Sequence, residues 1–131
     1  KVLIYMSKIL LIEDDQFLSS LLKNRLQKDG FEVILARDGE EAINFLKSFK
    51  PDLILLDIIL PKKSGFELLE EIHSNPQLSG GGVPVIIISN LGQPEDVSKG
   101  QSLGAIEYLV KAKISIDELT KRIKELVNKK Q

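Results

Sequence analysis

The chain of 131 residues is long enough for one domain with one core and too short for two. Its 18 basic and 19 acidic side chains give a net charge of -1, whereas nucleic-acid-binding domains usually carry an excess of positive charge. No apolar run approaches the roughly 18–20 residues that span a bilayer, and the absence of cysteine excludes disulfides and cysteine-based zinc sites. We therefore expect a cytoplasmic protein that binds neither nucleic acid nor membrane.

The first residues are expected to lie outside the natural domain. Five residues precede Met6, the only methionine, and Met6-Ser-Lys-Ile has the form of a start site. A segment this short, without a small-residue cleavage site, is not a signal peptide. We expect residues 1–5 to be a cloning or upstream remnant and residues 6–131 to be the domain.

Short apolar runs alternate with amphipathic helical patterns along the chain. Residues 9–12 form a continuous apolar run, which predicts a strand buried on both faces. Apolar residues at three- and four-residue spacing from Phe17 to Leu26 predict a helix, which Gly30 ends. The same reasoning predicts strands at 31–36, 53–57, 85–89 and 105–109, and helices at 38–49, 64–74, 94–104 and from about 116 to 127. This alternation predicts an α/β fold with a parallel sheet covered by helices on both faces.

Polar side chains appear abruptly where the predicted strands end. In an open doubly wound sheet, ligands bind at the carboxyl ends of the strands, so these side chains mark a candidate site. The residues are Glu13, Asp14 and Asp15 after the first strand, Asp57 after the third, Ser89 after the fourth and Lys111 after the fifth.

The acidic residues of this group favour a divalent cation. Carboxylates forced together raise each other's pKa unless a cation lies among them, and oxygen ligands without His or Cys suit Mg²⁺. Glu13, Asp14 and Asp57 are the expected ligands. The alternative is that Asp14 and Asp15 are only helix caps, and for Asp15 we expect that role.

The remaining polar residues suit phosphoryl chemistry. A carboxylate such as Asp57 can act as a nucleophile and form an acyl phosphate. Lys111 can pair with Asp57 at rest and with phosphoryl oxygens afterwards, and Ser89 offers a hydroxyl to such an oxygen. Considered alone, Lys111 could be a solvated lysine and Ser89 a strand-end turn residue.

The motifs together resemble the receiver domain of two-component response regulators, the family of the bacterial chemotaxis regulator, from Lys8 to about Asn128. They are Ile9-Leu-Leu-Ile-Glu-Asp-Asp15, Asp52-Leu-Ile-Leu-Leu-Asp-Ile-Ile-Leu-Pro61 with Gly65, Ile86-Ile-Ile-Ser89, Leu103-Gly-Ala105 and Tyr108-Leu-Val-Lys111. The resemblance implies a flavodoxin-like fold with five parallel strands in the order 2-1-3-4-5.

The resemblance also implies a role for each matching residue. Asp57 matches the phosphoacceptor, which also binds the metal, and Asp14 would hold Mg²⁺ or Mn²⁺ more directly than Glu13, which acts through water. Ile59 would supply a backbone carbonyl to the same ion. Lys111 matches the family's lysine. Ser89 matches the hydroxyl residue that moves toward the phosphoryl group, and Tyr108 matches the aromatic switch that follows it. Tyr108 could instead be an ordinary half-buried strand residue.

The family's activity follows from these roles. A histidine kinase or a phosphotransfer protein would transfer a phosphoryl group to Asp57, and the surface of the fourth helix, fifth strand and fifth helix would change and bind an output partner. The chain would be a signalling domain that catalyses only its own phosphorylation and dephosphorylation. It would be a monomer or a phosphorylation-dependent dimer, and either free-standing or a fragment of a larger regulator.

The sequence departs from the family pattern at two positions. Ala112 stands where the family usually has a proline, often after a cis peptide bond. A cis bond before alanine would cost about 2.5–4 kcal/mol, so we expect a trans bond and a different loop. Asn90 stands where a small residue is usual, and with Ile59 and Leu91 it would control the access of water to the acyl phosphate.

Three other readings remain open. A phosphatase with an aspartyl nucleophile typically needs an acidic residue two positions further on, where this chain has Ile59. A degenerate receiver would serve only for interaction, and a nucleotide-binding domain would need a glycine-rich motif after the first strand. We expect His73 to be a surface residue of the third helix, and Gly80 to Gly82 to be loop slack and not a phosphate-binding loop.

Overall fold

The computed structural model describes residues 7–78 and 82–130. The expected remnant at residues 1–5 lies outside this range, and so do Gly80 and Gly81 of the predicted glycine loop. Within the described range, no helix combines the length and the apolar character needed to cross a membrane.

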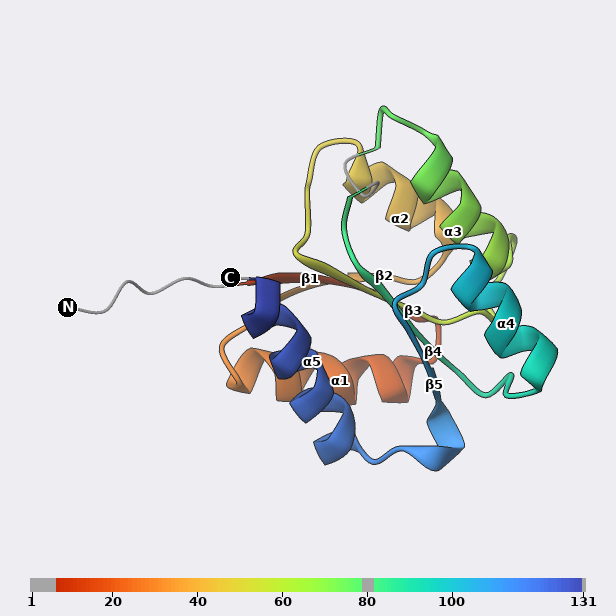
Figure 1. The fold of residues 1–131 in the computed structure, drawn as a ribbon. Helices are drawn as coiled ribbons and strands as arrows, with labels where there is room; N and C mark the ends of the chain where they lie inside the picture. The colour runs from red at the N-terminus through yellow and green to blue at the C-terminus, as the bar shows by residue number, and fades with distance from the viewer. Residues whose placement is uncertain (1–6, 79–81, 131) are drawn as a thin grey trace.

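Strands and helices alternate as predicted (Figure 1). The strands are β1 (Lys8–Ile12), β2 (Glu32–Ala36), β3 (Leu53–Leu56), β4 (Val85–Ser89) and β5 (Glu107–Val110). The helices are α1 (Gln16–Lys28), α2 (Gly39–Leu46), α3 (Gly65–Ser74), α4 (Pro94–Ser102) and α5 (Ile116–Lys130), with a 3-10 helix η1 (Lys111–Lys113) before α5. All neighbouring strands pair in parallel in the order β2-β1-β3-β4-β5. The predicted α/β flavodoxin-like fold is confirmed.

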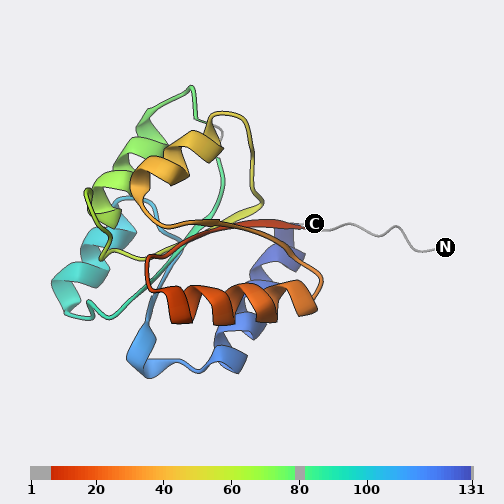
Figure 2. The ribbon, with the colours of Figure 1, turned by 180° about the vertical axis from the view of Figure 1, so that it is seen from behind.

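The sheet is the middle of three layers. Helices α2, α3 and α4 cover one face, and α1 and α5 cover the other (Figures 1 and 2). Successive side chains of a strand point to opposite faces, so Ile54 and Leu56 enter the core beneath α2 and α3, whereas Leu53 and Leu55 enter the core beneath α1 and α5. Burial on both faces explains why the central strands are uninterrupted apolar runs.

Side-chain hydrogen bonds fix the starts of four helices. Asp15 accepts a hydrogen bond from the backbone amide of Leu18, as expected of a helix cap. The other caps are Asp38 on Glu41, the reciprocal pair Ser64 and Glu67, and the reciprocal pair Ser115 and Glu118.

Several predicted boundaries were wrong by one to three residues, among them the three that follow. The second helix ends at Leu46 and not at 49, because the chain must leave the helical conformation before Pro51. The third strand ends at Leu56, which leaves Asp57 in the following loop. The fifth strand starts at Glu107 and not at 105, because the amide of Ala105 bonds the carbonyl of Gly100 and closes α4.

A strained turn connects β3 to α3. The amide of Lys63 bonds the carbonyl of Pro61 at 2.8 Å, and Lys62 between them has a φ of 71°. This combination describes a γ-turn with its central residue in the left-handed region, a rare and strained conformation for a residue with a side chain. The ammonium group of Lys62 lies 3.5 Å from carboxylate oxygens of both Asp38 and Glu40, so the turn is tied to the start of α2.

We predict that glycine is better tolerated than alanine at position 62. Both Lys62→Gly and Lys62→Ala remove the ion pairs, but only glycine relieves the left-handed strain, which costs roughly 1–2 kcal/mol. The glycine variant should therefore have the higher free energy of unfolding in urea. Lys63, whose φ is not positive, is the matched control, and there alanine should be the more stable variant. Equal stabilities of the two variants at position 62 would contradict the proposed strain.

Candidate functional site

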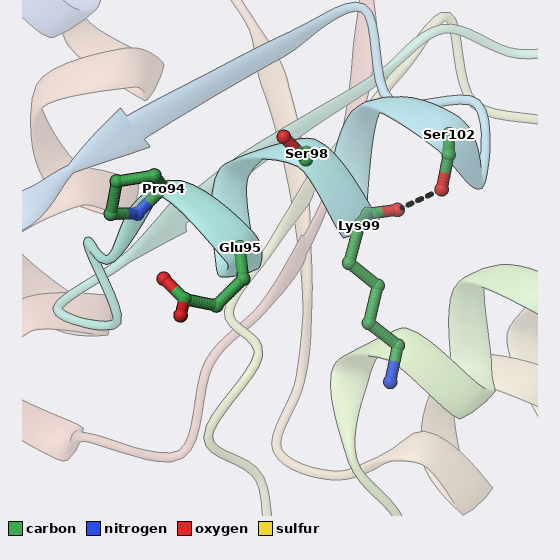
Figure 3. Close-up of a pocket in the computed structure, with 5 residues that line it drawn as sticks. All are labelled: Pro94, Glu95, Ser98, Lys99 and Ser102. Carbon is green, nitrogen blue, oxygen red and sulfur yellow. Dashed lines mark hydrogen bonds between the residues drawn. The ribbon is translucent and has the colours of Figure 1, made fainter.

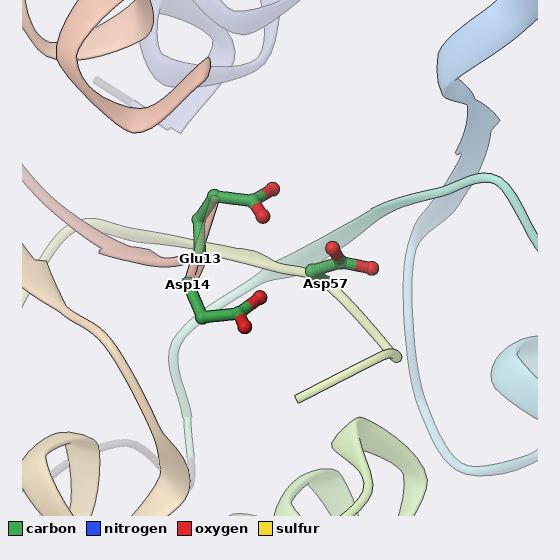
Figure 4. Close-up of side chains that lie close together, drawn as sticks. All are labelled: Glu13, Asp14 and Asp57. Atoms are coloured by element: carbon green, nitrogen blue, oxygen red, sulfur yellow. The ribbon is translucent and has the colours of Figure 1, made fainter. Parts of the chain in front are cut away.

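Three carboxylates meet at the carboxyl ends of two adjacent strands. β1 pairs with β3 so that Ile12 lies beside Leu56, and the next residues along the two strands are Glu13 and Asp57. One carboxylate oxygen from each of Glu13, Asp14 and Asp57 lies within 4.8 Å of the others. Figure 4 shows the three side chains extending in the same direction from these strand ends. The predicted metal-binding carboxylates therefore form one cluster.

Backbone hydrogen bonds continue the sheet past the strand ends and fix this cluster. The amide of Asp57 donates to the carbonyl of Ile12 at 3.0 Å, and the amide of Glu13 donates to the carbonyl of Ala36 at 3.0 Å. The two acidic residues thus share the rigidity of the sheet, although neither belongs to a strand.

The cluster is buried at one end and open at the other. Glu13 and Asp57 are only 3% and 4% exposed, whereas Asp14 is exposed. Burial of two carboxylates is costly unless positive charge or hydrogen bonds compensate it. A cation that arrives from solvent would meet Asp14 first.

Lys111 provides the compensating charge. Its ammonium group lies 2.7 Å from Oδ2 of Asp57 and 2.9 Å from Oε1 of Glu13. Lys111 is therefore not a solvated surface lysine. Burial disfavours its charged form, but the hydrogen bonds to Asp57 and Glu13 outweigh burial and raise the pKa of Lys111 above its usual 10.5. No cis peptide bond occurs among residues 7–78 and 82–130, so the expected trans bond before Ala112 is confirmed.

The second oxygen of each buried carboxylate accepts a backbone hydrogen bond. The amide of Ile59 donates to Oδ1 of Asp57 at 3.1 Å, and the amide of Asp15 donates to Oε2 of Glu13 at 3.1 Å. Burial nevertheless dominates at Glu13 and, together with the charge of Asp57, raises the pKa of Glu13 from 4.5 to about 7. Burial and the charge of Asp57 thus disfavour the charged form of Glu13, and a cation bound in the cluster would favour it.

The first turn of α3 rests on the loop that carries Asp57. The amide of Gly65 donates to the carbonyl of Ile58 at 2.8 Å, and a Cβ added to Gly65 would lie 2.4 Å from the backbone oxygen of Asp57. Backbone atoms cannot yield as a flexible side chain can, so this approach requires glycine. Ile59 remains 54% exposed on the outer side of the same loop.

Ser89 and Tyr108 meet at the backbone of Leu91. Ser89 is fully buried at the end of β4, and its hydroxyl accepts a hydrogen bond from the amide of Leu91 at 3.3 Å. The hydroxyl of Tyr108 donates to the carbonyl of Leu91. Burial, with a smaller contribution from the charge of Asp96, raises the pKa of Tyr108 above 10.0. The predicted hydroxyl and aromatic residues therefore contact the same residue of the β4–α4 loop.

Two contacts of α4 were missed by the sequence analysis. His73 is exposed, as expected, but its Nδ1 lies 2.9 Å from the carbonyl of Leu103 and so links α3 to the end of α4. Gly100 is the residue of α4 that the structure buries. Periodicity could not reveal the first contact, but a glycine inside a helix, where alanine is favoured, is a signal of close packing.

The charge of Glu13 should make the metal-free protein less stable as pH rises. Because the pKa of Glu13 is raised to about 7 by folding, its stabilising contribution is complete below about pH 4.5 and is lost as pH rises through 7. In EDTA, the free energy of unfolding should fall over this range by at most about 3 kcal/mol from this group. Glu13→Gln should lack this part of the slope in urea titrations at several pH values. Identical slopes for the two proteins would contradict the assignment.

Comparisons with known proteins agree with this geometry. The sequence matches the family described as "Response regulator receiver domain" over residues 9–124. The transcriptional regulatory protein CpxR of Escherichia coli strain K12 is 40% identical over 124 residues, which cover 95% of this chain and 50% of CpxR. The alkaline phosphatase synthesis transcriptional regulatory protein PhoP of Bacillus subtilis is 32% identical over 95% of this chain and 50% of its own length. The chain thus spans about half the length of these relatives.

Solved structures show the same similarity. The receiver domain of the Francisella response regulator 1452 superposes with a TM-score of 0.85 at 30% identity, covering 95% of this chain and 99% of the other. Sequence, fold and the arrangement of acidic residues therefore agree, and the chain belongs to the response regulator receiver domain family.

Proposed function

We propose that this receiver domain accepts a phosphoryl group on Asp57 from the phosphohistidine of a histidine kinase or a phosphotransfer protein. The observation that carries the proposal is the shared ammonium group of Lys111, which lies within 3 Å of both Asp57 and Glu13, beside the exposed Asp14. This arrangement holds a carboxylate nucleophile next to a fixed positive charge and a cation-binding cluster.

Asp57 is suited to the role of nucleophile. A carboxylate oxygen of Asp57 would form a bond to phosphorus while the bond from phosphorus to the donor's imidazole nitrogen breaks, which gives an acyl phosphate and a free imidazole. The amide of Ile59 fixes Oδ1 and Lys111 fixes Oδ2, so the carboxylate does not rotate. Catalysis then consists mainly of orientation and charge stabilisation, as is general for phosphoryl transfer.

The cluster fits Mg²⁺ or Mn²⁺ because all of its ligand atoms are oxygens. Asp14 and Asp57 would hold the ion directly, Glu13 through water, and Ile59 through its backbone carbonyl. The bound ion would supply positive charge that neutralises the entering phosphoryl oxygens. Lys111 would exchange part of its contact with Asp57 for a phosphoryl oxygen, and Ser89 would donate its hydroxyl to another.

We propose that the surface of α4, β5 and α5 transmits the signal to an output partner. Ser89 and Tyr108 both contact Leu91 at the start of the loop to α4. A movement of Ser89 would therefore displace this loop and act on Tyr108 of β5. Along the exposed side of α4 runs a shallow depression of about 650 Å³ (Figure 3). Its lining residues are Pro94, Glu95, Ser98, Lys99 and Ser102. On the other side of β5, Arg122 of α5 pairs with Glu107.

The wider biological context is also a proposal. Two relatives are transcriptional regulatory proteins by name, and this chain corresponds to half of their length. The domain would act in the cytoplasm, either alone or joined to an effector, as a monomer or as a phosphorylation-dependent dimer, without itself binding nucleic acid or membrane. Its own chemistry would be limited to its phosphorylation and dephosphorylation. Aspartyl phosphatases typically have a second acidic residue at the position of Ile59. We therefore expect no steady turnover of phosphate esters.

We predict that acetyl phosphate with Mg²⁺ adds one phosphoryl group to the wild-type protein, detected by intact mass spectrometry. Asp57→Asn should give no adduct because the nucleophilic oxygen is lost, and EDTA should strongly reduce the adduct on the wild type.

Asp15→Asn is the matched control for this experiment. Asparagine caps a helix as well as aspartate, and the side chain of Asp15 caps α1, so this variant should be phosphorylated like the wild type. A chain that serves only for interaction would give no adduct in any variant. An undiminished adduct on Asp57→Asn would equally contradict the assignment.

A further inference from the structure

The glycine inside α4 has a structural reason that the sequence alone does not give. Gly100 is buried in a helix whose other residues are exposed or half-buried. Glycine is less favourable than alanine in the interior of a helix, so a contact outside the helix must explain why glycine stands here.

That contact is with Tyr108. A Cβ added to Gly100 would lie 2.8 Å from Cδ2 and 3.2 Å from Cε2 of the tyrosine ring, and 2.7 Å from Cδ1 of Ile87. Distances this short between carbon atoms are strongly repulsive, since the optimum is about 3.5–4.0 Å. The ring therefore rests directly against the backbone of α4.

The ring is also held at its other end. Its hydroxyl donates to the carbonyl of Leu91, whose amide in turn donates to the hydroxyl of Ser89. A ring displaced by a side chain at position 100 would strain this hydrogen bond. Gly100, Ile87 and Leu91 thus contact the ring, which also packs against the core beneath α2 and α3.

We propose that Gly100 is a positioning residue that seats Tyr108 inward before any phosphoryl group is transferred. Phosphorylation would then move Ser89 and the β4–α4 loop relative to a ring that is already in place, and it would not rotate the ring inward. The statement about phosphorylation rests on the proposed function, whereas the seating of the ring depends only on the contacts described above.

The chain allows this proposal to be tested with a single fluorine label. It contains two tyrosines, Tyr5 and Tyr108, so Tyr5→Phe protein grown with 3-fluorotyrosine gives one tyrosine signal in ¹⁹F NMR. The difference in chemical shift between H₂O and D₂O measures the exposure of the ring to solvent. Adding Mg²⁺ and beryllofluoride gives separate ¹⁹F signals from the bound adduct, which report independently whether Asp57 is occupied.

The wild-type ring should show less than half the solvent isotope shift of free 3-fluorotyrosine, and the adduct should leave that value nearly unchanged. Gly100→Ala should expose the ring, so that its isotope shift approaches that of the free amino acid before beryllofluoride is added. Gln101→Ala, at an exposed neighbour in the same helix, should behave like the wild type. A ring exposed in the wild type, a large inward shift on adduct formation, or a Gly100→Ala spectrum equal to the wild type would each overturn the proposal.

A second measurement covers the case in which Gly100→Ala does not fold. In the Ile87→Val, Tyr108→Ala background both contacted groups are absent, so alanine at position 100 should no longer lower the urea midpoint and should raise it through helix propensity. An equal loss in both backgrounds would overturn the proposed contact. If no signals of bound beryllofluoride appear, the phosphoacceptor function fails, and the spectra without beryllofluoride still decide the position of the ring.

Discussion

The ion pairing of Lys111 with two buried carboxylates is the interaction on which the rest of the site depends. Parallel pairing of β1 and β3 brings Glu13 and Asp57 together at one edge of the sheet, where neither side chain reaches bulk water. Such a pair is strongly destabilising unless positive charge lies between its members. Lys111, delivered from the end of β5, supplies that charge. Three carboxylates and one ammonium group leave the cluster with an excess of acidic groups. This excess favours the binding of a divalent cation, which would then attract a phosphoryl group.

The surrounding backbone keeps this arrangement rigid. Gly65 lets α3 press directly on the backbone of Asp57, and the γ-turn at Lys62 returns the chain from the site to that helix within a few residues. On the other side, Leu91 joins Ser89 to Tyr108 through its amide and its carbonyl. Apolar side chains anchor the same loops, since Ile58 is buried in the core and Leu60 and Leu91 pack against it. A new charge at Asp57 therefore acts on a small number of defined hydrogen bonds.

The fold and the members of the acidic cluster could be predicted from the sequence because they depend on patterns local to each strand. Doubly buried strands are continuous apolar runs, and polar residues at their ends must meet at one edge of a parallel sheet. Strand order came from the family resemblance, since no local pattern encodes it. The pairing of Lys111 with Asp57 was predicted from their places at neighbouring strand ends and is confirmed. The second partner of Lys111, the shared contact with Leu91 and the packing of Gly100 on Tyr108 could not be predicted, because they join residues that are distant in sequence. The start of β5 was misplaced because the amide of Ala105 closes α4, a hydrogen bond that apolar character does not reveal.

We propose that the ends of β1 and β3 form a cation site whose negative charge Lys111 only partly neutralises. Paramagnetic Mn²⁺ tests it most directly, because it broadens the NMR signals of nearby amides. At low Mn²⁺ concentration, we expect broadening to be confined to residues 13–15 and 57–59, to be reversed by excess Mg²⁺ and to be weaker in Asp14→Asn. Broadening that spreads over the surface carboxylates, or that is unchanged in Asp14→Asn, would show that these strand ends do not form the cation site.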